Sequence, residues 1–205
     1  MENRKNSLRT AETALLLALC VTLLVGLAAR GEQRRLSDKV IRLHVLAVSD
    51  SEEDQSTKLR VRDEVLAYVT PLLKEAHSAQ EAATLLCRAL PALETIAREV
   101  SGEKTVSAVL SREVYPTREY ETFALPAGMY TSLRITLGAG AGHNWWCVVY
   151  PPLCTASAGD FAAAASALEE DEVKLITEDG AGYVVRFRVI EWWGELTAKL
   201  RDFRL

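Results

Sequence analysis

The residues best suited to chemistry or recognition lie in one short run, residues 142–154. This run holds two of the four tryptophans and two of the four cysteines of the 205-residue chain. Neighbouring side chains on a strand point to opposite faces, so Trp145 and Trp146 are expected to face opposite ways. Tryptophan serves either as a core residue or as an anchor in a protein interface. Either both faces of this strand are covered by protein, or one tryptophan faces a partner.

The two cysteines of this run, Cys147 and Cys154, flank the bend at Pro151 and Pro152. In a reducing cytoplasm they would be free thiols, whereas in an oxidising compartment they would close a short loop as a disulfide. A third reading makes Cys147 a nucleophile with His44 as its base. Because the amino terminus has the features of an export segment, the disulfide is the favoured reading.

Acidic and histidine side chains gather at the end of the first expected strand, where His44, Asp50 and Asp54 could converge. They offer a second candidate for catalysis. A metal centre needs three or four ligands at one point, and His77 and His143 show no zinc spacing. The sequence therefore predicts neither a metal nor another cofactor.

The amino terminus combines basic residues with an apolar run, the pattern of an export signal or a single signal-anchor. Residues 1–35 hold six basic and three acidic side chains, and the sixteen residues 14–29 carry no charge. As a helix this run extends about 24 Å, less than the roughly 30 Å hydrocarbon core of a bilayer. We expect a signal peptide or anchor in residues 1–30, a linker in residues 31–39 and one extracytoplasmic domain in residues 40–205.

The remaining chain is acidic, with eighteen basic and twenty-five acidic side chains. Nucleic-acid binding depends mainly on Lys and Arg that neutralise phosphates, so this balance argues against a nucleic-acid partner. Most charges near residue 60 pair along a helix at i,i+4 spacing, as in Arg60 with Glu64. Arg62 has no such partner and is open to pairing across the domain or with another molecule.

Alternation and capping patterns predict one strand, two helices and then several hairpins. Asp50 and Glu53 have the spacing of a capping box, and Thr70-Pro71 is expected to end the first helix. Pro91 should bend or split the second helix. The glycine-rich residues 138–142 lack the ending of a phosphate-binding loop and are interpreted as a hairpin loop. The expected strands are 40–48, 105–114, 117–125, 129–137, 145–150, 173–177 and 183–189, and the expected helices are 52–68, 78–100, 160–168 and 190–203.

This pattern predicts an α+β fold with a single mixed, mostly antiparallel sheet and packed helices. The domain is preceded by an N-terminal hydrophobic export or anchor helix. About 165 residues remain for the domain, which is enough to build one hydrophobic core.

Three blocks of the sequence resemble the stage II sporulation protein R family. The resemblance runs from Val40 to Cys154 and includes the apolar amino-terminal segment. The third block, with its adjacent tryptophans, is long and unusual and makes the match specific. The blocks are residues 41–51 with 54–55, 58–59 and 61–63; residues 125–130 with 133–134; and residues 138–140 with 144–148 and 151–154.

The resemblance implies an intercompartmental signalling protein of endospore formation. Members of the family are exported from the forespore into the space between the two membranes. There they activate a membrane-embedded aspartic protease of the mother cell, which then processes a sigma-factor precursor. The resemblance transfers no catalytic residue, so we expect a protein that is not an enzyme.

An activator of this kind acts by contact, and tryptophan and arginine are the usual anchors of protein interfaces. An exported hydrolase using Cys147 or a His44/Asp50 site remains an alternative, and so does an extracytoplasmic scaffold. The candidate partner-binding residues are Trp145, Trp146, Arg62, Arg118, Arg134, His44 and Asp50.

Overall fold

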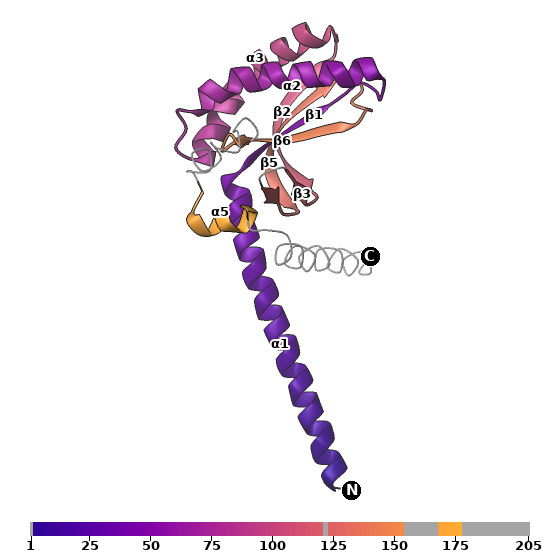
Figure 1. Cartoon of the computed structure of the whole chain (residues 1–205), viewed down its shortest axis with the longest axis vertical. Helices are drawn as coiled ribbons and strands as arrows, with labels where there is room; N and C mark the ends of the chain where they lie inside the picture. The colour runs from indigo at the N-terminus through magenta and orange to yellow at the C-terminus, as the bar shows by residue number, and fades with distance from the viewer. Residues whose placement is uncertain (1, 121–122, 154–167, 178–205) are drawn as a thin grey trace. The chain divides into compact units, whose positions relative to one another are not determined.

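The computed structural model describes residues 2–120, 123–153 and 168–177 (Figure 1). The chain divides into two compact units, residues 1–34 with 179–205 and residues 35–178. Helix α1 (Glu2–Lys39) begins in the first unit and ends in the second. In the first unit the leucines of the apolar run, such as Leu17 and Leu24, are exposed. Within the described part of the chain, no helix combines the length and apolarity needed to cross a membrane.

Residues 31–39, expected as a polar linker, are helical instead. Leu36 and Ser37 are buried, and Leu36 belongs to the second hydrophobic core together with Val40. Because Leu36 packs into this core, the folded body begins earlier than Val40, where the sequence had suggested its start.

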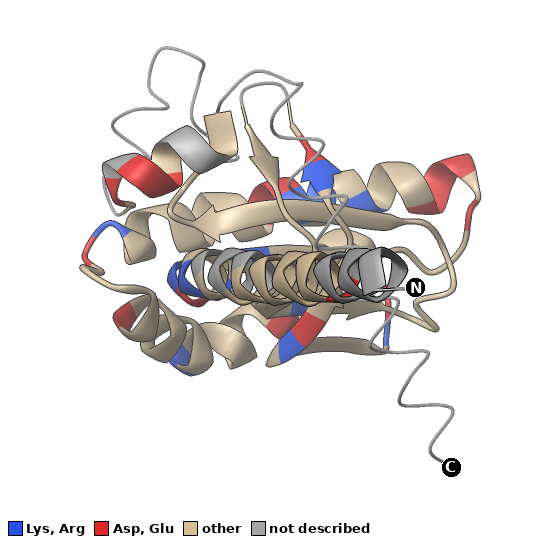
Figure 2. Cartoon of the chain, turned by 90° about the horizontal axis from the view of Figure 1, so that it is seen from below, with Lys and Arg blue, Asp and Glu red and all other residues tan. Residues whose placement is uncertain are grey.

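The body contains a four-stranded mixed sheet in the order β2-β5-β1-β6. Strand β1 (Ile41–Leu46) lies in the interior of this sheet, parallel to β5 (Gly128–Leu137) and antiparallel to β6 (Asn144–Tyr150). Strand β2 (Val106–Tyr115) runs antiparallel to β5 along its whole length. The predicted α+β class with one main mixed sheet is confirmed. Charged residues lie chiefly on helices and loops and only sparsely along the strands (Figure 2).

Helices α2 (Glu52–Leu73) and α3 (Ala79–Ser101) lie side by side over one face of this sheet (Figure 1). Each helix buries residues at intervals of three or four, which is the spacing of one helix face. These residues meet the inward side chains of β1, β5 and β6 in the first hydrophobic core. The buried helix residues include Val61, Val65 and Val69 of α2 and Ala82, Leu86 and Leu93 of α3.

The helix ends differ in part from the expectation. Ser78 caps α3 as predicted, since its side chain accepts a hydrogen bond from the Glu81 N–H. The cap of α2 is Ser51 rather than Asp50. Neither Pro71 nor Pro91 ends its helix. Both prolines are exposed, so water can satisfy the backbone carbonyl that each leaves without a helical partner.

The glycine-rich loop is not a hairpin, because β5 and β6 lie on opposite sides of β1. The loop crosses the end of β1, and the Gly142 N–H donates to the Ala47 carbonyl. A Cβ atom on Gly142 would lie 2.2 Å from the Ser49 carbonyl oxygen. Gly138 and Gly140 have positive φ values, which favour glycine. The close approach of the Ser49 backbone therefore explains Gly142, and the positive φ values explain Gly138 and Gly140.

The other face of the sheet, called the outer face here, is covered in part by smaller elements of the same unit. These are the short strands β3 (Arg118–Glu119) and β4 (Ala124–Leu125) and helix α5 (Glu170–Thr177). The predicted single strand over 117–125 was wrong, since β3 and β4 are separate and pair with each other. The predicted strand over 173–177 was also wrong, because this segment is helical. The helices expected over 160–168 and 190–203 and the strand over 183–189 lie wholly or mostly outside the described residues.

Candidate interaction surface

Four side chains form a row across the outer face of the sheet. The strand register places Val109 of β2 beside Arg134 of β5, Arg134 beside His44 of β1, and His44 beside Trp146 of β6. We call these four residues the outer-face row. Residues that are far apart in the sequence thus become neighbours, about 4.8 Å apart from strand to strand. Three of the four belong to the three sequence blocks that carry the family resemblance.

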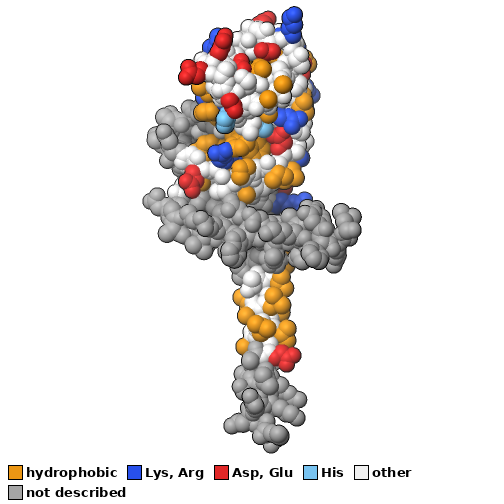
Figure 3. Space-filling model, turned by 90° about the vertical axis from the view of Figure 1, so that its right-hand side faces the viewer, with side chains coloured by type: hydrophobic (Ala, Val, Ile, Leu, Met, Phe, Trp, Pro, Cys, Tyr) orange, Lys and Arg blue, Asp and Glu red, His pale blue; other side chains and the backbone are white. Residues whose placement is uncertain are grey.

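The row is rich in aromatic contacts. The His44 ring lies 5.7 Å from the Trp146 ring and 6.2 Å from the Tyr115 ring, measured between centroids. The Arg118 guanidinium, carried by β3, lies 4.0 Å from the centre of the Trp146 ring. Trp146 is half-buried, and Arg118 is exposed. A face that brings together hydrophobic, basic and histidine side chains is visible in Figure 3.

Glu113 connects the members of this surface. Its carboxylate lies 3.0 Å from Arg134 Nη1 and 3.1 Å from His44 Nδ1, and Tyr115 donates its hydroxyl to it. Burial by itself raises the pKa of Glu113, but hydrogen bonds from Ser132 and His44 and the charges of His44 and Arg134 outweigh it and lower the pKa. Glu113 therefore holds His44 and Arg134 in place as a carboxylate.

Arg42 lies beneath the surface and is fully buried. Its guanidinium is 4.0 Å from the centre of the Tyr115 ring and 5.0 Å from that of Tyr130, and its Nη2 donates to the Tyr120 hydroxyl. Within the described residues, its Nε and Nη1 have no hydrogen-bond partner. Arginine stays charged in proteins, so Arg42 places a positive charge under the outer face, and no carboxylate among the described residues forms an ion pair with it.

Trp145 faces the helices, opposite to Trp146, as the sequence predicted. It packs against the first hydrophobic core, and the Arg62 guanidinium of α2 lies 4.4 Å from the centre of its ring. Arg62 also forms an ion pair with Asp63. Cys147 belongs to the same helix-side core, whereas His44 lies on the outer face. The sheet therefore separates Cys147 from His44, which does not support them as a nucleophile and its base.

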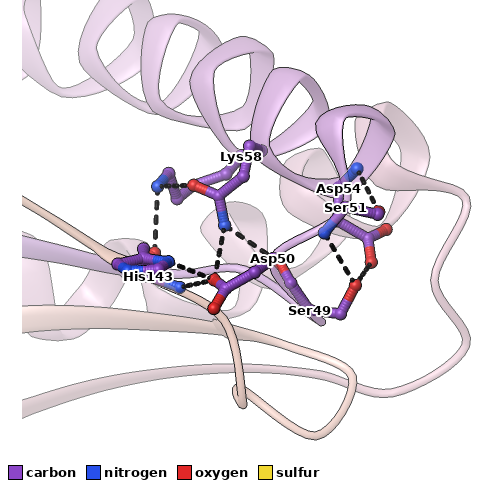
Figure 4. A network of polar contacts seen from close by, with 7 residues as sticks. Ser49, Asp50, Ser51, Asp54, Lys58 and His143 are labelled. Carbon is purple, nitrogen blue, oxygen red and sulfur yellow. Dashed lines mark hydrogen bonds and ion pairs between the residues drawn. The ribbon is translucent and has the colours of Figure 1, made fainter.

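Asp50 belongs to a second polar network, at the loops that follow β1 and β5 (Figure 4). Its carboxylate accepts hydrogen bonds from the backbone N–H and the ring of His143. The backbone hydrogen bond from His143 lowers the pKa of Asp50 most; burial opposes it, and the His143 ring and the charges of His143 and Lys58 add to the lowering. The nearly buried Lys58 donates to the His143 carbonyl and to Gln55. This network fixes the glycine-rich loop against the start of α2.

The structure thus divides the predicted site residues into separate groups. The outer face gathers His44, Arg118, Arg134 and Trp146, while Trp145 and Arg62 stack on the helix side. Asp50 and Asp54 do not converge with His44, since Asp54 accepts from Ser49 instead. Groups of three or more His, Cys, Asp or Glu side chains that could hold a metal are absent from the described residues.

Sequence reasoning missed Glu113, Tyr115 and Arg42. Glu113 and Tyr115 are two residues apart in strand β2, so alternation indicated that both point to one face. Their relation to His44 depended on the register of β2, β5 and β1, which the sequence pattern did not fix. Arg42 is two residues from His44 along β1, and the alternation of the strand did place both on one face, but Arg42 was not chosen as a site residue.

Acid should weaken the fold partly through Glu113. Because its pKa is lowered on folding, Glu113 stabilises the native state above its ordinary pKa of 4.5, and this contribution is lost as the pH falls through the folded-state pKa. We expect the Glu113→Gln variant to lose less stability than the wild-type protein between about pH 5 and pH 3. Urea unfolding midpoints at the two pH values measure this difference. Equal losses in the two proteins would contradict it.

The disulfide between Cys147 and Cys154 stays a prediction, because Cys154 lies outside the described residues. Cys20 and Cys87 are free thiols. We therefore expect alkylation of the unfolded exported protein without reductant to modify two of the four cysteines, Cys20 and Cys87. After reduction, all four should react. Mass spectrometry distinguishes the two results, and modification of Cys147 before reduction would rule the disulfide out.

Comparisons with known proteins agree with the sequence blocks. The family model described as Stage II sporulation protein R matches residues 37–160. Stage II sporulation protein R of Bacillus subtilis (strain 168) is 37% identical over 142 residues, which cover 64% of this chain and 63% of the relative. The chain therefore spans less than two thirds of the length of this relative. No solved structure matches significantly. The matched region contains β1 to β6 and the whole outer-face row.

Proposed function

Since the chain belongs to the stage II sporulation protein R family, we propose that it is an exported signal of endospore formation that activates a membrane-embedded aspartic protease. The protease then processes a sigma-factor precursor. In this proposal the protein is made in the forespore and exported into the space between the two membranes, directed or anchored there by residues 1–30. The protein acts as a ligand for the protease and not as an enzyme.

The observation that carries the contact part of the proposal is the outer-face row. Its half-buried Trp146 lies under an exposed arginine, and tryptophan and arginine are the residues most enriched among interface hot spots. Three sequence blocks of the family each supply one member of the row. We therefore assign the contact with the protease to Trp146, His44, Arg134 and Arg118.

The proposed mechanism is a shift between two states of the protease. A ligand activates an enzyme by contact only if it binds the active state more tightly than the resting state. A shift from about 1% to 99% active protease requires a preference of roughly ten-thousandfold, or about 5.5 kcal/mol. A few well-packed anchors of about 2 kcal/mol each suffice for this preference.

A hydrolase based on Cys147 and His44 gains no support from the geometry, because these residues lie on opposite faces of the sheet. His44 and Asp50 also belong to different networks. A plain scaffold would tolerate any change that leaves the domain folded. The activator and the scaffold therefore differ in their response to surface substitutions.

Reconstitution in non-sporulating cells tests the proposed function. The chain is produced together with the membrane protease and the sigma-factor precursor, and cleavage of the precursor is followed by immunoblot. We expect cleavage with the full chain and none with a form that lacks residues 1–30 and remains in the cytoplasm. Absence of cleavage in cells that export the folded protein would refute the assignment.

A further inference from the structure

We propose that the outer-face row recognises an acidic segment of a partner protein, whose carboxylates bind Arg118 and Arg134 beside Trp146. This inference rests on the proposed function, because it names the chemistry of the surface that the protease would present. Arg134 of the row is partly exposed, and Arg118 of the neighbouring strand β3 is exposed.

Arg118 is arranged to receive a carboxylate. Its guanidinium stacks on the Trp146 ring at 4.0 Å, so the ring restrains the guanidinium plane. A stacked guanidinium keeps its N–H groups at its edge, where a carboxylate can accept two of them side by side. Among the described residues, no carboxylate forms an ion pair with Arg118. Glu119 follows it on β3, where alternation turns its side chain the other way.

Arg134 offers a second donor on the same surface. Glu113 binds one of its terminal nitrogens at 3.0 Å, and the side chain remains 42% exposed. Glu113 thereby fixes the position of Arg134 and leaves further N–H groups at the surface. Arg134 stands one strand from His44 and two from Trp146. A partner segment that lies across the strands would meet a carboxylate site at each end of an aromatic centre.

Arg42, which is buried beneath the outer face, strengthens the attraction of this surface for an acidic segment. No carboxylate among the described residues forms an ion pair with Arg42, and its Nε and Nη1 lack hydrogen-bond partners there. In a low-dielectric interior a charge is poorly screened, so its field reaches the surface above. Arg42, Arg118 and Arg134 stand against Glu113 here, although the chain as a whole has a net charge of −4. The outer-face row is thus a local positive region on an acidic protein.

A protein segment fits this surface better than a nucleic acid or a lipid bilayer. An extended phosphate surface carries many charges, so an acidic chain repels it more strongly than a short segment with a few carboxylates. Arg118, which lies over Trp146, and Arg134, two strands away, suit two carboxylates that are separated by an apolar side chain. The outer-face row and Arg118 therefore suit an acidic peptide segment that contains a hydrophobic residue.

Direct binding tests the inference without the protease. The full-length chain in mild detergent is titrated with the peptide Glu-Glu-Leu-Glu-Glu and, separately, with Lys-Lys-Leu-Lys-Lys, and tryptophan fluorescence reports binding. We expect the acidic peptide to bind and the basic peptide not to bind. The Arg118→Gln/Arg134→Gln double variant should weaken binding of the acidic peptide at least tenfold. The Arg88→Gln variant, which removes an exposed arginine of α3, should bind as the wild-type protein does.

The outcomes separate this inference from the proposed function. Failure of the acidic peptide to bind, or equal binding by the double variant, overturns the inference even if precursor cleavage in cells is normal. Tighter, arginine-dependent binding of inorganic polyphosphate would also overturn it, because phosphate rather than carboxylate would then be preferred. Binding as expected without cleavage in cells would leave the recognition of acidic segments standing and refute the protease as the target.

Discussion

In reconstituted cells, the Trp146→Ala variant is expected to reduce cleavage of the sigma-factor precursor at least tenfold while the protein remains folded and exported. Trp146 combines a partly exposed indole, a stacked arginine and a neighbouring histidine at the β6 end of the outer-face row. Loss of an interface anchor of this kind costs about 2 kcal/mol or more, which corresponds to roughly thirtyfold in affinity. Immunoblots of the precursor over time measure the effect.

Trp145 provides a matched control from the next position of the same strand. Both tryptophans are half-buried and both lie beside an arginine, but Trp145 faces α2 and the first hydrophobic core. We expect Trp145→Ala to lower thermal stability without a selective loss of cleavage at temperatures where the protein is folded. If both variants lose cleavage equally at equal levels of folded protein, the contact does not lie on the outer face.

The Leu133→Ala variant is expected to destabilise the domain by about 3 kcal/mol. Leu133 is fully buried in β5 and lies between Leu43 of β1 and Leu110 of β2 in the sheet register. Its truncation removes apolar contacts in the middle of the first hydrophobic core and leaves a cavity. Urea unfolding, monitored by circular dichroism, measures the loss.

Val114→Ala serves as the comparison for this loss. Val114 also lies on a strand, but its side chain is 75% exposed. We expect its replacement to change the free energy of unfolding by less than about 0.5 kcal/mol. A small effect at Leu133, similar to that at Val114, would show that the centre of the sheet is not packed as described.

The sequence predicted those elements whose pattern is strictly local. Alternation found β1, β2, β5 and β6 to within one or two residues, and serine capping located the start of α3. The errors arose where tertiary contacts override local signals. Residues 173–177 carry β-branched residues typical of strands, yet Ile176 packs as part of a helix into the second core. Pro71 lies in the last turn of α2 and is exposed, so water can satisfy the carbonyl that the proline leaves without a helical partner.

Several residues of the candidate surface could be predicted from the sequence, but their positions relative to one another could not. Sequence reasoning chose Trp146, His44 and Arg134, but it grouped Asp50 with them and omitted Glu113. The cause is the parallel pairing of β1 with β5, since register between strands 90 residues apart is not encoded in either strand alone. The glycine-rich loop was predicted to be a hairpin loop for the same reason. It joins β5 to β6, but β1 lies between these two strands in the sheet.

The outer-face row exists only in the folded domain. His44, Arg134 and Trp146 become neighbours only after β6 has paired with β1, which needs almost the whole matched region of the chain. Contacts between such distant residues form late in folding, because long loops must close first. A chain that is still being synthesised, or is held unfolded during transport, therefore cannot display the row. In the proposed function, contact with the protease therefore has to wait until β6 has paired with β1.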